Sequence, residues 1–267
     1  MNSVAESTRA THRRSGVARI PGIEMQTMQP SNDAKDAPRI SGRDIALIGQ
    51  SRTKSKYSQL TIEERSVYER VHNSLSVLGA AVQHKLGAYG AYGLKVTSGF
   101  STRSGVRGYL PKDLWFGLYN QQNIITSVGN PQLFMIASYR GIECGFAASI
   151  HPATFSDRAV QERVRSAAPR IFAALPDANS EPAVQLQKKL ANGWYFRRRA
   201  RLRPNVQEFP SLDAWLSFLK SPLGAQWAAG CISRYLLTQD LDRPEIRLMG
   251  LVTDMADIFS TLMTIVA

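Results

Sequence analysis

Cysteine is scarce in this sequence of 267 residues, which holds only Cys144 and Cys231. Two cysteines this far apart provide neither a disulfide framework nor a zinc site of paired cysteines. Long apolar runs are also missing: no stretch approaches the ~18 apolar residues that a membrane helix requires, and Asp254 and Asp257 interrupt the apolar C-terminal segment. The composition therefore favours a cytoplasmic protein that does not enter a membrane.

The N-terminus lacks the apolar core of a secretory signal, because Arg13 and Arg14 are followed by polar residues. The first 23 residues hold four arginines against one acidic residue, Glu6. Organelle transit peptides have a similar composition, so that alternative stays open.

Common catalytic and cofactor motifs are absent too. The sequence has no GxxxxGK[ST] phosphate loop, no GxGxxG after an expected strand, and no HExxH among its four histidines. We therefore expect no metal site, no cofactor and no complete catalytic constellation. A scattered active site would have to draw on His151, Asp157, Glu143 and Ser98, and His151 is equally suited to cap a helix after a strand.

Positive charge is abundant but unevenly placed. The net charge is +12, and residues 161–220 hold 11 basic against 5 acidic side chains, whereas residues 221–267 hold 3 against 5. Residues 1–56 hold 10 basic against 5 acidic side chains. Concentrated positive charge attracts polyanions and supports salt-sensitive binding to nucleic acid.

The pattern of apolar residues divides the chain into two regions. Residues 1–56 are polar and show no apolar period, so we expect a disordered basic tail. The short apolar patch at Ile45, Leu47 and Ile48 is suited either to docking on the folded domain or to a transient turn. Residues 57–267 carry the periodic segments and are expected to form a single domain.

The expected elements of that domain begin with a helix from Thr61, which has capping-box spacing with Glu64. Four short segments, at residues 94–97, 114–119, 133–139 and 142–149, have the composition of strands, with Arg140 and Gly141 as a hairpin turn. Helices are expected at residues 155–175, 182–191, 211–220, 224–237 and from 244 to the end. Strands that precede helices favour an α+β fold, a mostly antiparallel sheet with helices packed on it.

The most concentrated polar signal lies at residues 194–203, where three aromatic residues run into five arginines. In an extended strand, Arg197, Arg199, Arg201 and Arg203 would project from one face and could contact phosphates. The alternative is an edge strand whose arginines are solvated and prevent aggregation.

A glycine-rich loop at residues 98–112 provides a second candidate site, with Arg103, Arg107 and Lys112 as its cations. Small residues let backbone amides approach a ligand. A plain hairpin connection is the alternative.

The order of features resembles that of the N-terminal target-recognition domain of McrB-type restriction ATPases. The resemblance is carried by the long helix, the glycine- and arginine-rich loop, the stretch PKDLWFGL at residues 111–118, the strand containing Phe146 and the stretch AGCISRYL at residues 229–236. It implies recognition of DNA, often with a modified cytosine flipped into an aromatic-lined pocket. Trp115, Tyr119 and Tyr139 would then be the residues to suspect. The chain lacks the GTPase motor, so cleavage or translocation would need a separate ATPase or nuclease subunit.

The sequence thus predicts a non-enzymatic nucleic-acid-binding module, directed at DNA and with a place in a restriction or antiviral defence system. The alternative from a different class is a protein-interaction or effector protein whose basic tail serves delivery or docking.

Overall fold

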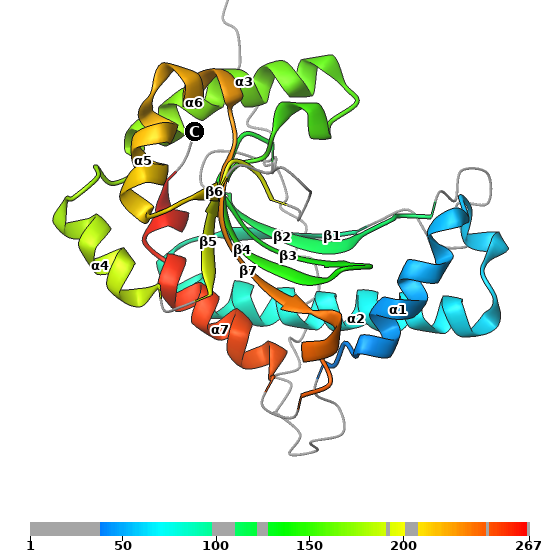
Figure 1. Ribbon diagram of the computed structural model, residues 1–267. Helices are drawn as coiled ribbons and strands as arrows, with labels where there is room; N and C mark the ends of the chain where they lie inside the picture. The colour runs from blue at the N-terminus through cyan, green and yellow to red at the C-terminus, as the bar shows by residue number, and fades with distance from the viewer. Residues whose placement is uncertain are drawn as a thin grey trace, which may run out of the picture. The chain divides into compact units, whose positions relative to one another are not determined.

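A computed structural model describes residues 38–97, 110–121, 128–190, 193–200, 208–243 and 246–265. Within these residues the chain folds into one seven-stranded antiparallel sheet with helices packed on it (Figure 1). The expected α+β class is confirmed. None of the described helices is long and apolar enough to cross a membrane.

The sheet has the strand order β1-β2-β3-β4-β7-β5-β6. The first four strands form a meander, and β7 then lies between β4 and β5, far from its neighbours in sequence. The strands are β1 (Tyr92–Val96), β2 (Leu114–Asn120), β3 (Gln132–Ser138), β4 (Gly141–Ser149), β5 (Trp194–Arg197), β6 (Glu208–Phe209) and β7 (Gly230–Leu237).

Helices α1, α2 and α7 lie on one side of the sheet, and α3, α5 and α6 lie near its other side (Figure 1). The helices are α1 (Gly42–Gln50), α2 (Ile62–Leu86), α3 (Arg158–Ala174), α4 (Glu181–Lys189), α5 (Leu212–Lys220), α6 (Pro222–Trp227) and α7 (Leu248–Phe259). Short 3₁₀ turns connect several of them, including η1 (Ser51–Thr53), η2 (Tyr57–Gln59), η3 (Gly87–Tyr89), η5 (Pro152–Thr154), η6 (Thr238–Asp240) and η7 (Leu262–Thr264).

The start of α2 follows directly from its local sequence. Thr61 Oγ1 accepts a hydrogen bond from the Glu64 amide, and the Glu64 carboxylate accepts one from the Thr61 amide at 2.6 Å. This capping box satisfies two backbone donors that a helix start otherwise leaves unpaired.

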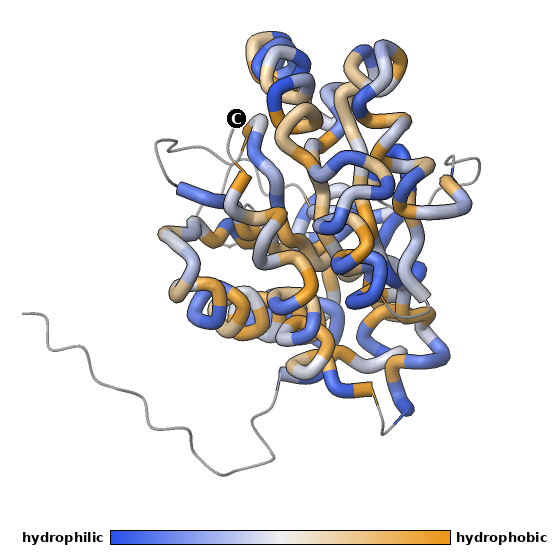
Figure 2. Tube along the Cα trace, turned by 90° about the vertical axis from the view of Figure 1, so that its left-hand side faces the viewer, coloured by the Kyte–Doolittle hydropathy of each residue, from blue (hydrophilic) through white to orange (hydrophobic). Residues whose placement is uncertain are grey.

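Strand alternation assigns each sheet residue to one of two faces. The core face, against α2 and α7, carries buried residues such as Phe116, Met135 and Phe146. The residues between them, among them Trp115, Phe134 and Ile136, form a smaller separate cluster on the opposite face, which we call the cavity face. Figure 2 shows hydrophobic and hydrophilic residues interspersed along the helices.

The expected boundary between tail and domain at residue 56 is wrong. Helix α1 begins at a Ser41 cap, and Ile45 and Ile48 are completely buried in the main core. Burial of these side chains provides the free energy that orders this polar segment. Residues 1–37 lie outside the described structure.

Two other expectations need correction. Residues 224–237 are not one helix, because α6 ends at Trp227, the next residue Ala228 adopts the left-handed conformation with φ 55°, and β7 follows. The β3–β4 hairpin turn is one residue earlier than expected, since Ser138 pairs with Gly141 and leaves Tyr139 and Arg140 as the turn.

Candidate functional site

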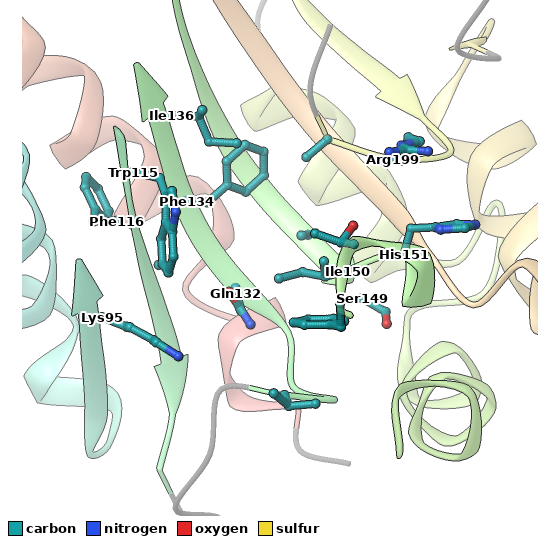
Figure 3. Close-up of a pocket in the computed structure, with 16 residues that line it drawn as sticks. Lys95, Trp115, Phe116, Gln132, Phe134, Ile136, Ser149, Ile150, His151 and Arg199 are labelled. Carbon is teal, nitrogen blue, oxygen red and sulfur yellow. The ribbon is translucent and has the colours of Figure 1, made fainter. Parts of the chain in front are cut away.

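A cavity of about 340 Å³ lies against the cavity face of the sheet (Figure 3). Side chains of β1, β2, β3 and β4 line its floor, and the segment after β4, with Ile150, His151 and Phe155, lines one wall. Arg199 and Ala200, which follow β5, complete it. A concave site of this size with aromatic, apolar and a few polar groups is typical of small-ligand sites.

The register of the strands explains why the floor is hollow. Lys95 pairs with Gly117, Gly117 with Phe134, and Phe134 with Gly145. Directly paired residues of antiparallel strands project to the same face. The Phe134 ring therefore stands between Gly117 and Gly145, and because glycine has no side chain there is room on both sides of the ring.

Gly117 provides space rather than backbone freedom, because its φ lies outside the left-handed region. A Cβ atom at this position would lie 2.9 Å from Oε1 of Gln132 and 3.7 Å from Cζ3 of Trp115. Gly145 differs, since a Cβ there would lie 2.0 Å from the carbonyl oxygen of Ile232. Gly117 therefore keeps the cavity open, whereas Gly145 lets β4 and β7 approach closely enough to pair.

Trp115 lines the cavity and is half-buried, as the hypothesis of a pocket near this residue requires. Its backbone is fixed by Thr97, whose amide donates to the Trp115 carbonyl at 2.8 Å and whose hydroxyl also donates to it at 3.0 Å. The indole is therefore presented from a rigid strand pair.

His151 lies at the end of β4 and caps the short helix η5. Its Nδ1 accepts a hydrogen bond from the Ala153 amide at 3.2 Å, so the proton of the neutral ring is on Nε2. Burial, and then the positive charges of Arg199 and Arg165, lower the pKa of His151 below its usual value. His151 thus acts as a neutral cap, and Asp157 caps α3 rather than orienting the imidazole.

Two tryptophans fix the chain that leads to Arg199. The indole Nε1–H of Trp215 donates to the Arg197 carbonyl, and that of Trp227 donates to the Arg198 carbonyl, both at 3.1 Å. The Arg198 guanidinium lies over the Trp227 ring, with 5.1 Å from its Cζ to the ring centroid. Consecutive carbonyls held in this way define the path of the backbone into the cavity.

Of the expected row of surface arginines, only Arg197 and Arg199 lie within the described residues, and β5 ends at Arg197. Arg197 is buried, with a side chain 4% exposed, and its guanidinium pairs with Glu208 at 2.6 Å. It also packs on the rings of Tyr195 and Tyr235. Arg197 is therefore a structural residue with its own counter-charge, and only Arg199 of the described arginines in this row lines the cavity.

The remaining suspected residues lie outside the cavity or outside the described chain. Tyr119 is buried on β2 with its ring over Gly93, and Lys112 is exposed ahead of that strand. Tyr139 lies in the hairpin turn, where the Arg52 guanidinium is 3.7 Å from its ring centroid. Arg103, Arg107, Arg201, Arg203 and Ser98 fall outside the described residues.

Lys95, Gln132 and Phe134 also line the cavity, and they were not among the candidate residues identified from the sequence. Lys95 and Phe134 lie on expected strands, but the sequence does not say which of the two faces of a strand is the core. Gln132 lies one residue before the expected strand at residues 133–139. Glu143 also lies on the cavity face, buried opposite Tyr235. Burial and the Glu143 carboxylate raise the pKa of Tyr235, so this pair belongs to the packed part of that face.

The described residues contain no cluster of histidine, cysteine and acidic side chains suited to a metal ion. Comparison with known proteins finds neither a matching family model nor a significantly similar curated protein.

Proposed function

We propose that this protein binds nucleic acid and that the cavity accepts one base, stacked on Trp115. The observation that carries the proposal is the lining itself: three aromatic rings, those of Trp115, Phe134 and Phe155, in a cavity whose charged side chains, Lys95 and Arg199, are both cationic. Aromatic faces stack on bases, and lysine and arginine pair with phosphates.

Gln132 adds a polar group suited to a base edge. It lies on the floor beside Gly117, and its carboxamide offers both a donor and an acceptor. Bases displaced from a stack are recognised by this combination of ring stacking and hydrogen bonds to their edges. The resemblance to McrB-type recognition domains makes DNA, and a modified cytosine in particular, the first ligand to test.

A protein-binding role has less support in the structure. The large hydrophobic side chains exposed among the described residues are spread over α2, η3, α4, β5, α6 and β7. Exposed hydrophobic residues scattered singly are normal on protein surfaces.

Fluorescence anisotropy with labelled DNA and RNA oligonucleotides at low salt tests the proposal. Trp115→Ala removes the stacking platform, which is worth about 1–3 kcal/mol per base, so affinity should fall by roughly 5- to 150-fold. Tyr139→Ala, an aromatic substitution outside the cavity, is the control and should bind normally. Normal binding by a folded Trp115→Ala variant, or no binding by the parent protein, would refute the proposal and favour a protein partner.

A further inference from the structure

We propose that α3 is a phosphate-binding surface, along which a nucleic-acid strand continues after one of its bases has entered the cavity. Three arginines of this helix, Arg158, Arg163 and Arg170, contact the phosphates. This inference rests on the proposed function and adds an interaction surface outside the cavity. Figure 1 shows α3 on the side of the sheet opposite α2 and α7.

Helix α3 carries an excess of positive charge that the helices on the core face lack. It holds four arginines and one glutamate, whereas α7 holds two aspartates and no basic residue. Lysine and arginine balance glutamate in α2, with three of each sign. A charge distribution of this kind orients an approaching polyanion toward the α3 side of the molecule.

Three arginines of α3 have no counter-charge within the described part of the chain. Arg158, Arg163 and Arg170 are exposed, and none of them forms an ion pair with a described residue. Glu162, the one acidic residue of the helix, lies 3.5 Å from the guanidinium of Arg165, which offsets its charge. Guanidinium groups left without a carboxylate in this way suit phosphate, which arginine can bind through two parallel hydrogen bonds.

The exposed face of α3 gives a strand room between these arginines. Arg163 and Arg170 are seven residues apart, nearly two turns, so they lie on one edge of this face about 10 Å apart along the axis. Arg158 lies on the other edge. Exposed small side chains recur every seven residues between the two edges: Ala159, Ser166 and Ala173. A sugar–phosphate backbone can therefore approach the helix closely.

Two contacts connect α3 to the wall of the cavity. The side-chain amide of Gln161 donates to the carbonyl oxygen of Phe155 at 2.8 Å, and Phe155 lines the cavity. The stem of Arg163 packs beside Gly129, where a Cβ atom would lie 4.0 Å from the Arg163 Cγ, and the preceding residue, Val128, also lines the cavity. The basic surface thus begins at the cavity wall.

The aromatic cavity favours nucleic acid over other polyanions. An acidic lipid surface would also be attracted by the arginines, but it offers no planar base to the rings of Trp115 and Phe134. A nucleic-acid strand uses both features, because its bases stack on aromatic side chains and its phosphates pair with cations.

Fluorescence anisotropy with labelled single-stranded oligonucleotides of random sequence tests the inference, with probes of about three and about twelve nucleotides. Helix α3 is about 25 Å long, so only the longer probe can fill the cavity and also follow the helix. Combined replacement of Arg158, Arg163 and Arg170 by glutamine should weaken binding of the longer probe about tenfold or more. The slope of log affinity against log salt should fall by about 2, since each phosphate contact of a single strand contributes about 0.7. Binding of the short probe should change little.

The matched control removes three exposed cations elsewhere, through Lys188→Gln and Lys189→Gln on α4 and Arg247→Gln before α7. This control should bind both probes normally. Replacement of the three α3 arginines by lysine keeps their charge and should keep most of the salt slope, which separates phosphate contacts from a structural role. Glutamine and lysine form helices well, so all these variants should melt like the parent protein.

A glutamine variant that binds the longer probe like the control, while Trp115→Ala binds it weakly, would overturn the role of α3 and leave the base-binding proposal intact. Equal losses for the two probes would also overturn it, because the arginines would then act on the cavity itself. If the parent binds vesicles containing phosphatidylserine through these arginines and binds no oligonucleotide, the surface belongs to a membrane and the proposed function falls as well.

Discussion

The indole of Trp227 donates its Nε1–H to the carbonyl oxygen of Arg198 at 3.1 Å. The same indole ring lies 4.4 Å from the His151 ring, centroid to centroid. Trp227 thus joins two walls of the cavity, the segment after β4 and the segment after β5. Neither wall is close to the other in sequence, so this contact helps to set their separation.

We expect Trp227→Phe to weaken nucleic-acid binding about threefold or more while the protein stays folded. Phenylalanine keeps the ring against His151 and Arg198 but loses the hydrogen bond, which costs about 1 kcal/mol and lowers Tm by roughly 2–4 °C in a domain of this size. Trp194→Phe, on the core face against Phe259, is the control. Unchanged affinity in the Trp227 variant would show that this contact does not position Arg199.

Gly117→Ala should close part of the cavity without unfolding the protein. The new methyl group would lie 2.9 Å from Gln132 Oε1, the far end of a flexible side chain that can move aside into the ligand space. We expect Tm to change by no more than a few degrees and affinity to fall about tenfold, measured by thermal melting and anisotropy.

Gly145→Ala is the opposite case, because its methyl group would meet the backbone oxygen of Ile232 at 2.0 Å. The free energy of unfolding of the Gly145→Ala variant should therefore fall strongly, and thermal melting measures this.

The prediction for Gly117→Ala has its own contrary outcome. A Gly117→Ala protein that binds normally would show that the ligand does not use the floor beside Gln132.

Stability should depend on Glu64 at acidic pH. Burial favours the neutral carboxyl group, but hydrogen bonds from Lys54, the Thr61 amide and Ser51 outweigh it and lower the pKa of Glu64 from 4.5 to about 2. Because this pKa is depressed in the folded state, its contribution is complete above about pH 4.5 and is lost as the pH falls toward 2. The Glu64 carboxylate contributes at most about 3 kcal/mol to the free energy of unfolding.

Thermal melting across this pH range measures the effect. Glu64→Gln should be less stable than the parent at neutral pH and should show a shallower decline between pH 4.5 and 2. Parallel curves for the two proteins would mean that other carboxylates dominate acid unfolding.

The N-terminal boundary of the domain can be tested by two truncations. A chain that starts at Tyr57 loses Ile40, Ile45 and Ile48 from the core and the hydrogen bond from the Gly42 amide to Asp242. Each buried isoleucine contributes about 1.5–3 kcal/mol, so Tm should fall by more than about 10 °C. A chain that starts at Pro38 keeps these contacts and should melt close to the full-length protein. Equal melting of the two truncations would contradict the packing of α1.

The local sequence determined several elements of this protein. The capping box at Thr61 and Glu64 fixed the start of α2, and short apolar segments bounded by turn residues located β2, β3 and β4 within one or two residues. The sequence analysis also singled out Trp115, which lines the cavity. These features depend on interactions between residues that are near in sequence, or on strand alternation, so a single sequence contains them.

Tertiary structure alone decided the rest. Residues 230–237 became a strand because β4 and β5 offer hydrogen-bonding edges on both sides, and a short apolar segment has no strong preference of its own. Arg197 became a buried residue because Glu208, eleven positions away, provides its counter-charge. The cavity itself depends on the register that aligns Lys95, Gly117 and Phe134, and on the two tryptophans that place Arg199. Pairings of this kind join residues distant in the chain, and no local pattern records them.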